Sequence, residues 1–165
     1  MNQRGFSLIE LLLVVIIILV LAALAIPNFM RAKMRANEGS AVGSLRQINT
    51  AAVIYFTSYA NGYPPNLATL GPPAAFATWD AADLLDGLLG QDPANKSGYT
   101  MTFAPGPPNA AAPVGCTNPG SNAYAINADP TILGTTGDRF FFTDQAGVIR
   151  FSTAGPATAA DPPIA

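Results

Sequence analysis

The chain has 165 residues, enough for one globular domain with an appendage. Charged residues make up only 11% of it, and residues 62–165 contain three basic and eight acidic residues, a balance that argues against nucleic acid as a partner. The absence of histidine excludes Ser–His–Asp and Cys–His nucleophile systems, and no phosphate-binding glycine loop is present, so we expect neither an enzyme nor a cofactor.

A long apolar run follows a very short polar leader at the N-terminus. Sixteen consecutive apolar residues extend from Leu11 to Ile26, and the segment is 21 residues long when counted from Phe6, interrupted only by Ser7 and Glu10. A helix of that length spans about 31 Å, which matches the hydrocarbon core of a bilayer. An ionised carboxylate in such a helix costs roughly 2–3 kcal/mol or more unless it is paired or lies at the interface. Glu10 therefore needs a partner or access to water.

The residues around Glu10 resemble the processing motif of type IV prepilins and pseudopilins, proteins that polymerise into pili or secretion pseudopili. The resemblance rests on the sequence Gly-Phe-Ser-Leu-Ile-Glu, which runs from Gly5 to Glu10, and on Pro27. It implies that a prepilin peptidase in the membrane cuts between Gly5 and Phe6 and methylates the new amino group of Phe6. It also implies that Glu10 pairs with the free amino terminus of a neighbouring subunit during assembly.

Two other interpretations of this stretch remain open. A secretory signal peptide would end in small residues, and Ala23-Leu24-Ala25 fits such a site, but its apolar core would be 7–15 residues long and would lack an acid near its start. A plain transmembrane anchor, with Glu10 reaching to water at the interface, is the other alternative.

The basic residues that flank the apolar run conflict with the orientation that the resemblance implies. Arg31, Lys33 and Arg35 follow the run and outnumber Arg4 together with the α-amino group. The positive-inside rule would therefore place the C-terminal side in the cytoplasm. The resemblance implies the opposite orientation, with the leader inside and the rest of the chain outside, because the peptidase cuts on the cytoplasmic side.

The pattern after Pro27 changes from wholly apolar to amphipathic. Apolar residues recur at steps of three and four and predict one buried helical face: Ala41, Val42, Leu45, Ile48, Ala52, Val53, Phe56 and Tyr59. Asn61-Gly62 suits a left-handed helix cap, and Pro64-Pro65 prevents continuation. We expect one helix from about Phe6 to Tyr59, roughly 80 Å long. Pro27 removes a backbone donor and predicts a kink, while the resemblance implies that the helix around it can become extended in a filament.

The remaining residues predict a small mixed head. We expect a helical turn at 66–70, a helix over 81–89 capped by Asp80, and a hairpin turn at 144–147. Four strands are expected at 99–103, 123–127, 139–143 and 148–152. The predicted fold class is α+β: a long N-terminal helix packed against a small antiparallel sheet, which is also the type IV pilin fold.

The predicted organisation has three parts. Residues 1–5 are a leader peptide, residues 6–61 form the long helix with 6–30 as its membrane or filament core, and residues 62–165 form the globular head. Within the head, residues 105–121 are rich in Pro, Ala, Gly and Asn and predict a surface loop, and residues 154–165 predict a flexible tail.

Few residues of the head suggest a ligand site. Cys116 is the single cysteine, so it forms no intrachain disulfide, and we interpret it as an incidental loop residue. We interpret three acids at three-residue steps as a helix cap and a solvated helix face rather than as a metal site: Asp80, Asp83 and Asp86. Calcium is a weak alternative for three acids that we expect in loops, Asp129, Asp138 and Asp144. Their spacing does not match the loop of an EF-hand.

The function that the sequence predicts is a structural subunit of a type IV pilus. Its expected partners are further copies of itself in a helical filament, the prepilin peptidase, an assembly platform in the inner membrane, and the lipid bilayer before assembly. It is expected as a single-pass inner-membrane precursor with a periplasmic head and then as an extracellular filament. The alternatives are a pseudopilin of type II secretion and, less favoured, a membrane-anchored periplasmic binding module.

Overall fold

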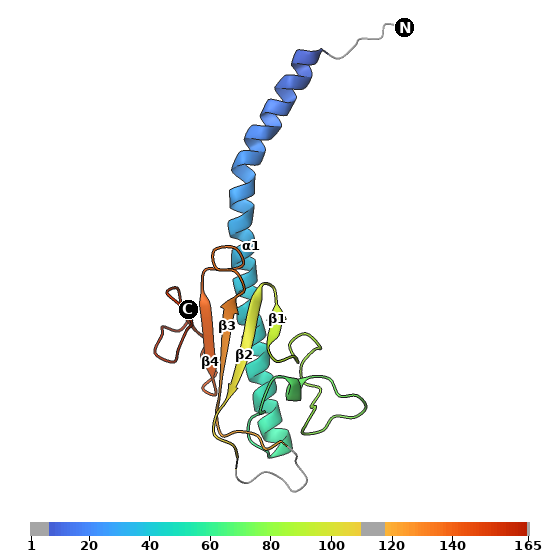
Figure 1. Ribbon diagram of the computed structural model, residues 1–165, viewed down its shortest axis with the longest axis vertical. Coiled ribbons are helices and arrows are strands. Elements are labelled where there is room, and N and C mark those ends of the chain that lie inside the picture. The colour runs from blue at the N-terminus through green and yellow to red at the C-terminus, as the bar shows by residue number, and fades with distance from the viewer. Residues whose placement is uncertain (1–6, 110–117, 165) are drawn as a thin grey trace.

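A computed structural model describes residues 7–109 and 118–164 and consists of one long helix with a head on its rear half. The helix, α1, spans Leu8–Tyr59, and its 52 residues measure about 78 Å. Figure 1 shows the front half of α1 extending free of the head, while the rear half lies against it. The α+β fold of a long helix and an antiparallel sheet is confirmed. Gly5, Phe6 and Cys116 lie outside the described residues.

The helix continues through Pro27 without a break. Proline supplies no N–H for the carbonyl of Ala23, and the side chain of Asn28 donates a hydrogen bond of 3.1 Å to the neighbouring carbonyl of Leu24. Figure 1 shows the helix curving gently rather than kinking sharply. At the other end the left-handed cap residue is Ala60, with φ of 51°, whereas the predicted pair was Asn61-Gly62. Gly62 of that pair also has a positive φ, of 87°. Asn61 is fully buried instead and accepts a hydrogen bond from the N–H of Gly120 at 3.2 Å.

The head contains a single antiparallel sheet whose strands lie in chain order, from β1 to β5. The strands are β1 Ala94–Lys96, β2 Tyr99–Pro105, β3 Tyr124–Pro130, β4 Phe140–Asp144 and β5 Arg150–Ser152. The four predicted strands are present with shifted ends, and the short edge strand β1 was missed. The predicted turn between β4 and β5 is confirmed: the N–H of Gly147 bonds the carbonyl of Asp144 at 2.9 Å, and Gly147 adopts φ of 72°.

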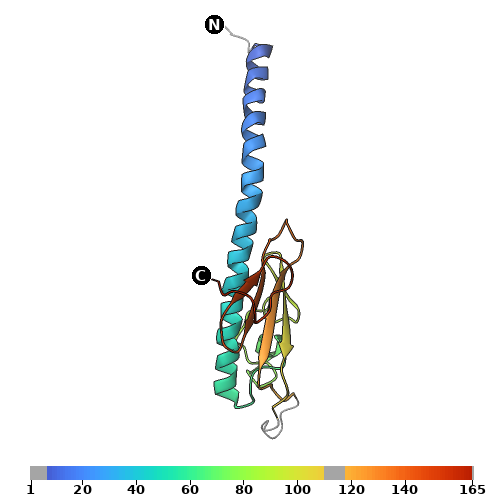
Figure 2. The same ribbon diagram turned by 90° about the vertical axis from the view of Figure 1, so that its left-hand side faces the viewer.

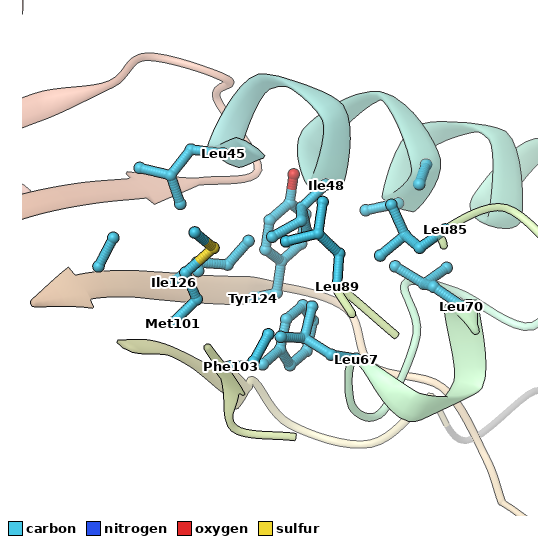
Figure 3. Packing of buried hydrophobic residues seen from close by; sticks show 14 of the residues in the cluster. Leu45, Ile48, Leu67, Leu70, Leu85, Leu89, Met101, Phe103, Tyr124 and Ile126 are labelled. Atoms are coloured by element: carbon cyan, nitrogen blue, oxygen red, sulfur yellow. The ribbon is translucent and has the colours of Figure 1, made fainter. Parts of the chain in front are cut away.

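The core lies between the rear half of α1 and one face of the sheet (Figure 3). The helix contributes a buried stripe at alternating steps of four and three residues: Ala41, Leu45, Ile48, Ala52 and Tyr55. The predicted face was partly wrong, because Val53 and Phe56 are 48% and 46% exposed, while Ala51 and Tyr55 are buried. Residues 53 and 56 lie about 100° around the helix from residues 52 and 55, which places them at the edge of the stripe.

The predicted helix over residues 81–89 is absent. Asp83 takes a positive φ of 55°, and the N–H groups of Leu84 and Leu85 both donate to the carbonyl of Leu70, in the 3-10 turn η1 Ala68–Leu70. These bonds take the place of the hydrogen bonds that a helix would form between residues four apart. Asp80 therefore caps no helix, whereas Asp86 accepts bonds from the N–H groups of Leu88 and Leu89.

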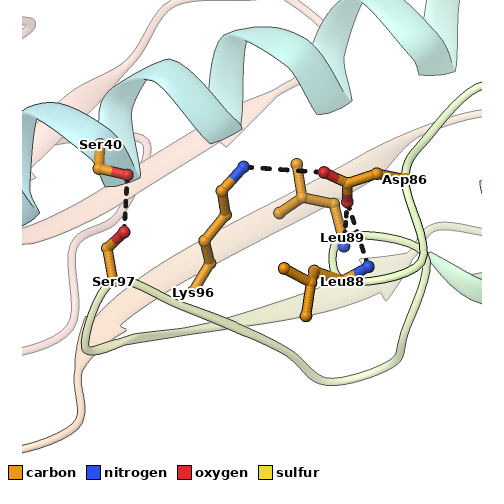
Figure 4. A network of polar contacts seen from close by, with 6 residues as sticks. All are labelled: Ser40, Asp86, Leu88, Leu89, Lys96 and Ser97. Carbon is orange, nitrogen blue, oxygen red and sulfur yellow. Dashed lines mark hydrogen bonds and ion pairs between the residues drawn. The ribbon is translucent and has the colours of Figure 1, made fainter.

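Polar contacts fasten this irregular segment to the sheet and the sheet to α1. Figure 4 shows Lys96 of β1 reaching Asp86 at 3.9 Å, and the hydroxyls of Ser97 and Ser40 in contact at 2.9 Å. The turn between β1 and β2 therefore lies beside residue 40 of the helix.

The C-terminal tail differs from the expectation of a flexible segment. The N–H of Phe151 donates to the carbonyl of Pro162 at 3.1 Å, and the N–H of Ile164 donates to that of Ile149 at 2.9 Å. Ala157 is buried. The described part of the tail thus folds back along β5. Of the predicted loop over 105–121, residues 110–117 lie outside the described residues.

Candidate assembly site

The front of α1, residues 8–30, exposes apolar side chains on every side, and we name it the apolar front. Each of its large apolar side chains is at least 43% exposed. By length and composition, the described residues contain this one helix that could cross a membrane. A helix that is apolar all round is stable only where its whole circumference is covered. The head covers none of this segment, so the cover must come from lipid or from other chains.

Glu10 lies in the first turn of α1, at the tip of the apolar front. The N–H groups of Glu10 and Leu11 both donate to the carbonyl of Ser7, at 3.0 and 3.2 Å, and this closes the first turn. A carboxylate here interacts favourably with the positive end of the helix dipole. Within the described residues no cation pairs with Glu10. A cationic partner would therefore have to come from outside this part of the chain.

The candidate residues named from the sequence do not form one cluster. Glu10 and Pro27 lie 17 residues apart on one helix, about 26 Å along its axis. Gly5 and Phe6 fall outside the described residues. The arrangement is a linear series along an exposed helix, which suits contacts with other long helices and not the enclosure of a small molecule.

The residue that holds the head on the helix was missed by sequence reasoning. Glu38 is 5% exposed, and its carboxylate accepts hydrogen bonds from the backbone N–H of Asp138 at 3.0 Å and from Nε of Arg139 at 2.8 Å. Nη2 of Arg139 forms an ion pair with the same carboxylate at 2.7 Å. The guanidinium of Arg139 also lies 5.5 Å from the ring of Phe141. No local pattern in the sequence marks Glu38 for this role, because its partners are a hundred positions away.

A buried tyrosine completes this junction. Burial raises the pKa of the Tyr99 hydroxyl, and the carboxylate of Glu38 raises it further. The hydroxyl therefore stays protonated and donates a hydrogen bond of 2.8 Å to the carbonyl of Arg139. Tyr99 and Glu38 thus fix the start of β4 from two sides.

The acids considered for metal binding do not gather into a site. In residues 7–109 and 118–164 there is no cluster of three acidic or cysteine side chains that could hold a metal ion. Asp86 pairs with Lys96, and the carboxylate of Asp80 accepts a hydrogen bond from the side chain of Asn118 at 3.3 Å. Asp144 accepts a bond from the N–H of Ala146 and shapes the β4–β5 turn.

Comparison with known proteins finds similarity over about a third of the chain or less. Residues 1–26 match the family described as the prokaryotic N-terminal methylation motif. The type IV major pilin protein of Myxococcus xanthus is 46% identical over 56 residues, which cover 34% of this chain and 26% of that protein. The type IV wide pilus major component of Thermus thermophilus is 57% identical over 37 residues, covering 22% and 28%.

A second group of relatives comes from protein secretion. The type II secretion system core protein G of Escherichia coli is 42% identical over 54 residues, which cover 33% of this chain and 37% of that protein. The chain thus spans about a quarter to two fifths of the length of these curated relatives. No solved structure matches it. These matches confirm the resemblance to the type IV pilin and pseudopilin family, and the apolar helix with its motif fits an inner-membrane precursor.

Proposed function

We propose that this chain is a structural subunit of a type IV pilus, made as an inner-membrane precursor and polymerised into a filament at the cell surface. The observation that carries the proposal is the apolar front of α1, exposed on all sides with an acid in its first turn. The bilayer covers this segment before assembly. Outside the bilayer only a bundle of like helices covers it, so the same surface that anchors the precursor drives its polymerisation.

The proposed maturation takes place at the N-terminus. A prepilin peptidase cuts between Gly5 and Phe6 and methylates Phe6, in keeping with the match of residues 1–26 to the methylation motif. The amino terminus of the incoming subunit then neutralises Glu10 of a subunit already in the filament. Pro27, which leaves the carbonyl of Ala23 without its helical donor, lets the helix loosen there during assembly. An assembly platform in the inner membrane lifts the subunit out of the bilayer.

A structural role requires no catalysis by this chain. The relatives named above are a pilin, a pilus component and a secretion-system core protein. We accordingly assign the chain no catalytic residue and no cofactor.

A pseudopilin of type II secretion is the second candidate, and it has its own support. The match to core protein G covers almost as many residues as the match to the Myxococcus pilin, 54 against 56. A pseudopilin would form a short periplasmic filament and would not be recovered from the cell surface.

Mass spectrometry of the N-terminal peptide separates these functions. We expect a peptide that begins at N-methylated Phe6 in filaments sheared from cells. The same peptide confined to the membrane fraction would favour the pseudopilin. A mature chain that begins at Met1 or Ile26 would overturn both.

The role of Glu10 is tested by substitution in the same cells. We expect Glu10→Ala to be processed normally but to yield few filaments, since a buried ammonium group would be left without its partner. Glu10→Asp keeps the charge and serves as the matched control, with partial recovery expected. Filament yield from Glu10→Ala equal to that of the unchanged protein would refute the assigned role.

A further inference from the structure

The end of the head nearest the apolar front carries a basic groove. The groove has a volume of about 680 Å³ and lies between α1 and the β3–β4 loop, residues 131–139. Its lining includes Arg31 and Arg35 from the helix and Asp138 from the loop. Among the residues that the structure describes, neither arginine forms an ion pair.

The charge of the groove favours an anion. Glu38 and Arg139, which also line it, neutralise each other across 2.7 Å. The remaining charges in the lining are those of Arg31, Arg35 and the single carboxylate of Asp138, which leaves an excess of one positive charge. Arginine binds phosphate oxygens through two parallel N–H groups, so two free guanidinium groups suit a phosphate ligand.

An exposed apolar pair lies on the same loop. Ile132 and Leu133 are both 58% exposed. The loop that carries them is fixed to α1, because the side chain of Asn37 donates a hydrogen bond of 2.9 Å to the carbonyl of Thr136 and Glu38 accepts the N–H of Asp138. Figure 2 shows this loop rising from the head toward the N-terminal end of α1.

The spacing along α1 sets the depth of these groups when the apolar front lies in a bilayer. Arg31 follows the last residue of the front, and Asn37 lies seven residues beyond Met30, about 10 Å along the axis. The headgroup region of a leaflet is roughly 5–8 Å thick. The arginines therefore lie at headgroup level. The loop contacts the helix at Asn37, just outside that level, and it rises from there toward the N-terminal end of α1 (Figure 2).

We propose that this end of the head is a membrane-contact surface that binds an acidic phospholipid. The phosphate occupies the groove between Arg31 and Arg35, and Ile132 and Leu133 enter the interface beside it. The surface continues the apolar front without a gap, and its charge is complementary to anionic headgroups. Lipid binding also accounts for basic residues on the side of the span where the positive-inside rule disfavours them. The inference rests on the proposed membrane-inserted precursor.

Lipid selectivity of the full chain tests the groove. The protein is reconstituted in phosphatidylcholine nanodiscs, and electron paramagnetic resonance measures the association of trace spin-labelled phosphatidylglycerol relative to spin-labelled phosphatidylcholine. We expect a preference for phosphatidylglycerol that falls about fivefold for each arginine lost in Arg31→Gln and Arg35→Gln. Arg46→Gln removes the same charge farther along the helix, where the side chain is also exposed, and should leave the preference unchanged.

An environment-sensitive fluorophore tests the apolar pair. With Cys116→Ser as the background, NBD is attached to Leu133→Cys or to Leu88→Cys, whose native side chains are similarly exposed at 58% and 56%. We expect blue-shifted emission in nanodiscs at position 133 only. Equal emission at the two positions would overturn the contact.

The outcomes separate this inference from the proposed function. Insertion into the discs with no lipid preference, or a preference that survives loss of both arginines, would overturn the inference alone. A preference seen only when two copies share a disc would assign the groove to a second chain and would overturn the lipid assignment. A chain that does not insert into discs would overturn both the membrane precursor and the inference.

Discussion

Replacing Glu38 by alanine should loosen the head from α1. The carboxylate accepts two hydrogen bonds, from the N–H of Asp138 at 3.0 Å and from Nε of Arg139 at 2.8 Å, and it forms an ion pair with Nη2 of Arg139 at 2.7 Å. Removing one partner of a buried pair costs about 3–5 kcal/mol, but the Arg139 side chain is 41% exposed and regains water when Glu38 is lost. Hydrogen bonds to charged groups contribute roughly 1.5–3 kcal/mol each. Because water replaces part of this interaction for Arg139, we expect the free energy of unfolding to fall by about 2 kcal/mol.

The assay is thermal unfolding of the full chain in a mild detergent, followed by the fluorescence of Trp79. The hydroxyl of Tyr55, on α1, donates to the carbonyl of Trp79 at 2.7 Å, so this probe reports the packing of the head on the helix. A loss of 2 kcal/mol corresponds to a midpoint lower by about 7 °C for a domain of this size. Glu38→Gln keeps an acceptor and should lose about half as much, and Arg46→Ala is the exposed control on the same helix. An unchanged midpoint for Glu38→Ala would refute the assigned anchoring role.

Three further predictions concern packing, pH and processing. Gly137→Ala would place its new methyl group against the hydroxyl of Tyr99 and should cost about 2–3 kcal/mol in chemical denaturation, whereas Gly155→Ala has open space around it and should change stability little. Burial raises the pKa of Asp129 above its ordinary value of 3.8, so the folded state loses stability as the pH rises from 3.8 through the raised pKa. Asp129→Asn should therefore raise the midpoint of thermal unfolding at pH 7 and not at pH 3. Gly5→Trp should block cleavage by the prepilin peptidase, and a mature chain of normal mass from that variant would contradict the assigned site.

The sequence alone determined the parts of this protein that depend on local pattern. A run of apolar residues with few interruptions has to be a helix wherever water is excluded, because a helix satisfies every backbone group within itself. The alternating strands and the Asp144–Gly147 turn were likewise readable, because their signals lie within a few residues. The motif around Glu10 was readable for the same reason.

Other features were decided only by the tertiary structure. Residues 81–89 have the composition of a short helix, yet their N–H groups bond the carbonyls of Thr69, Leu70 and Gly71, which come close only in the folded head. The C-terminal tail looks unstructured by composition, yet it pairs with β5.

The anchor at Glu38 and the groove beside it were also decided only by the tertiary structure. They join residues of α1 to residues about a hundred positions later, and no periodicity within either segment marks the partner. Local patterns specify elements because backbone hydrogen bonding is local in a helix and a turn. The docking of one element on another depends on side chains that meet only after the chain has folded.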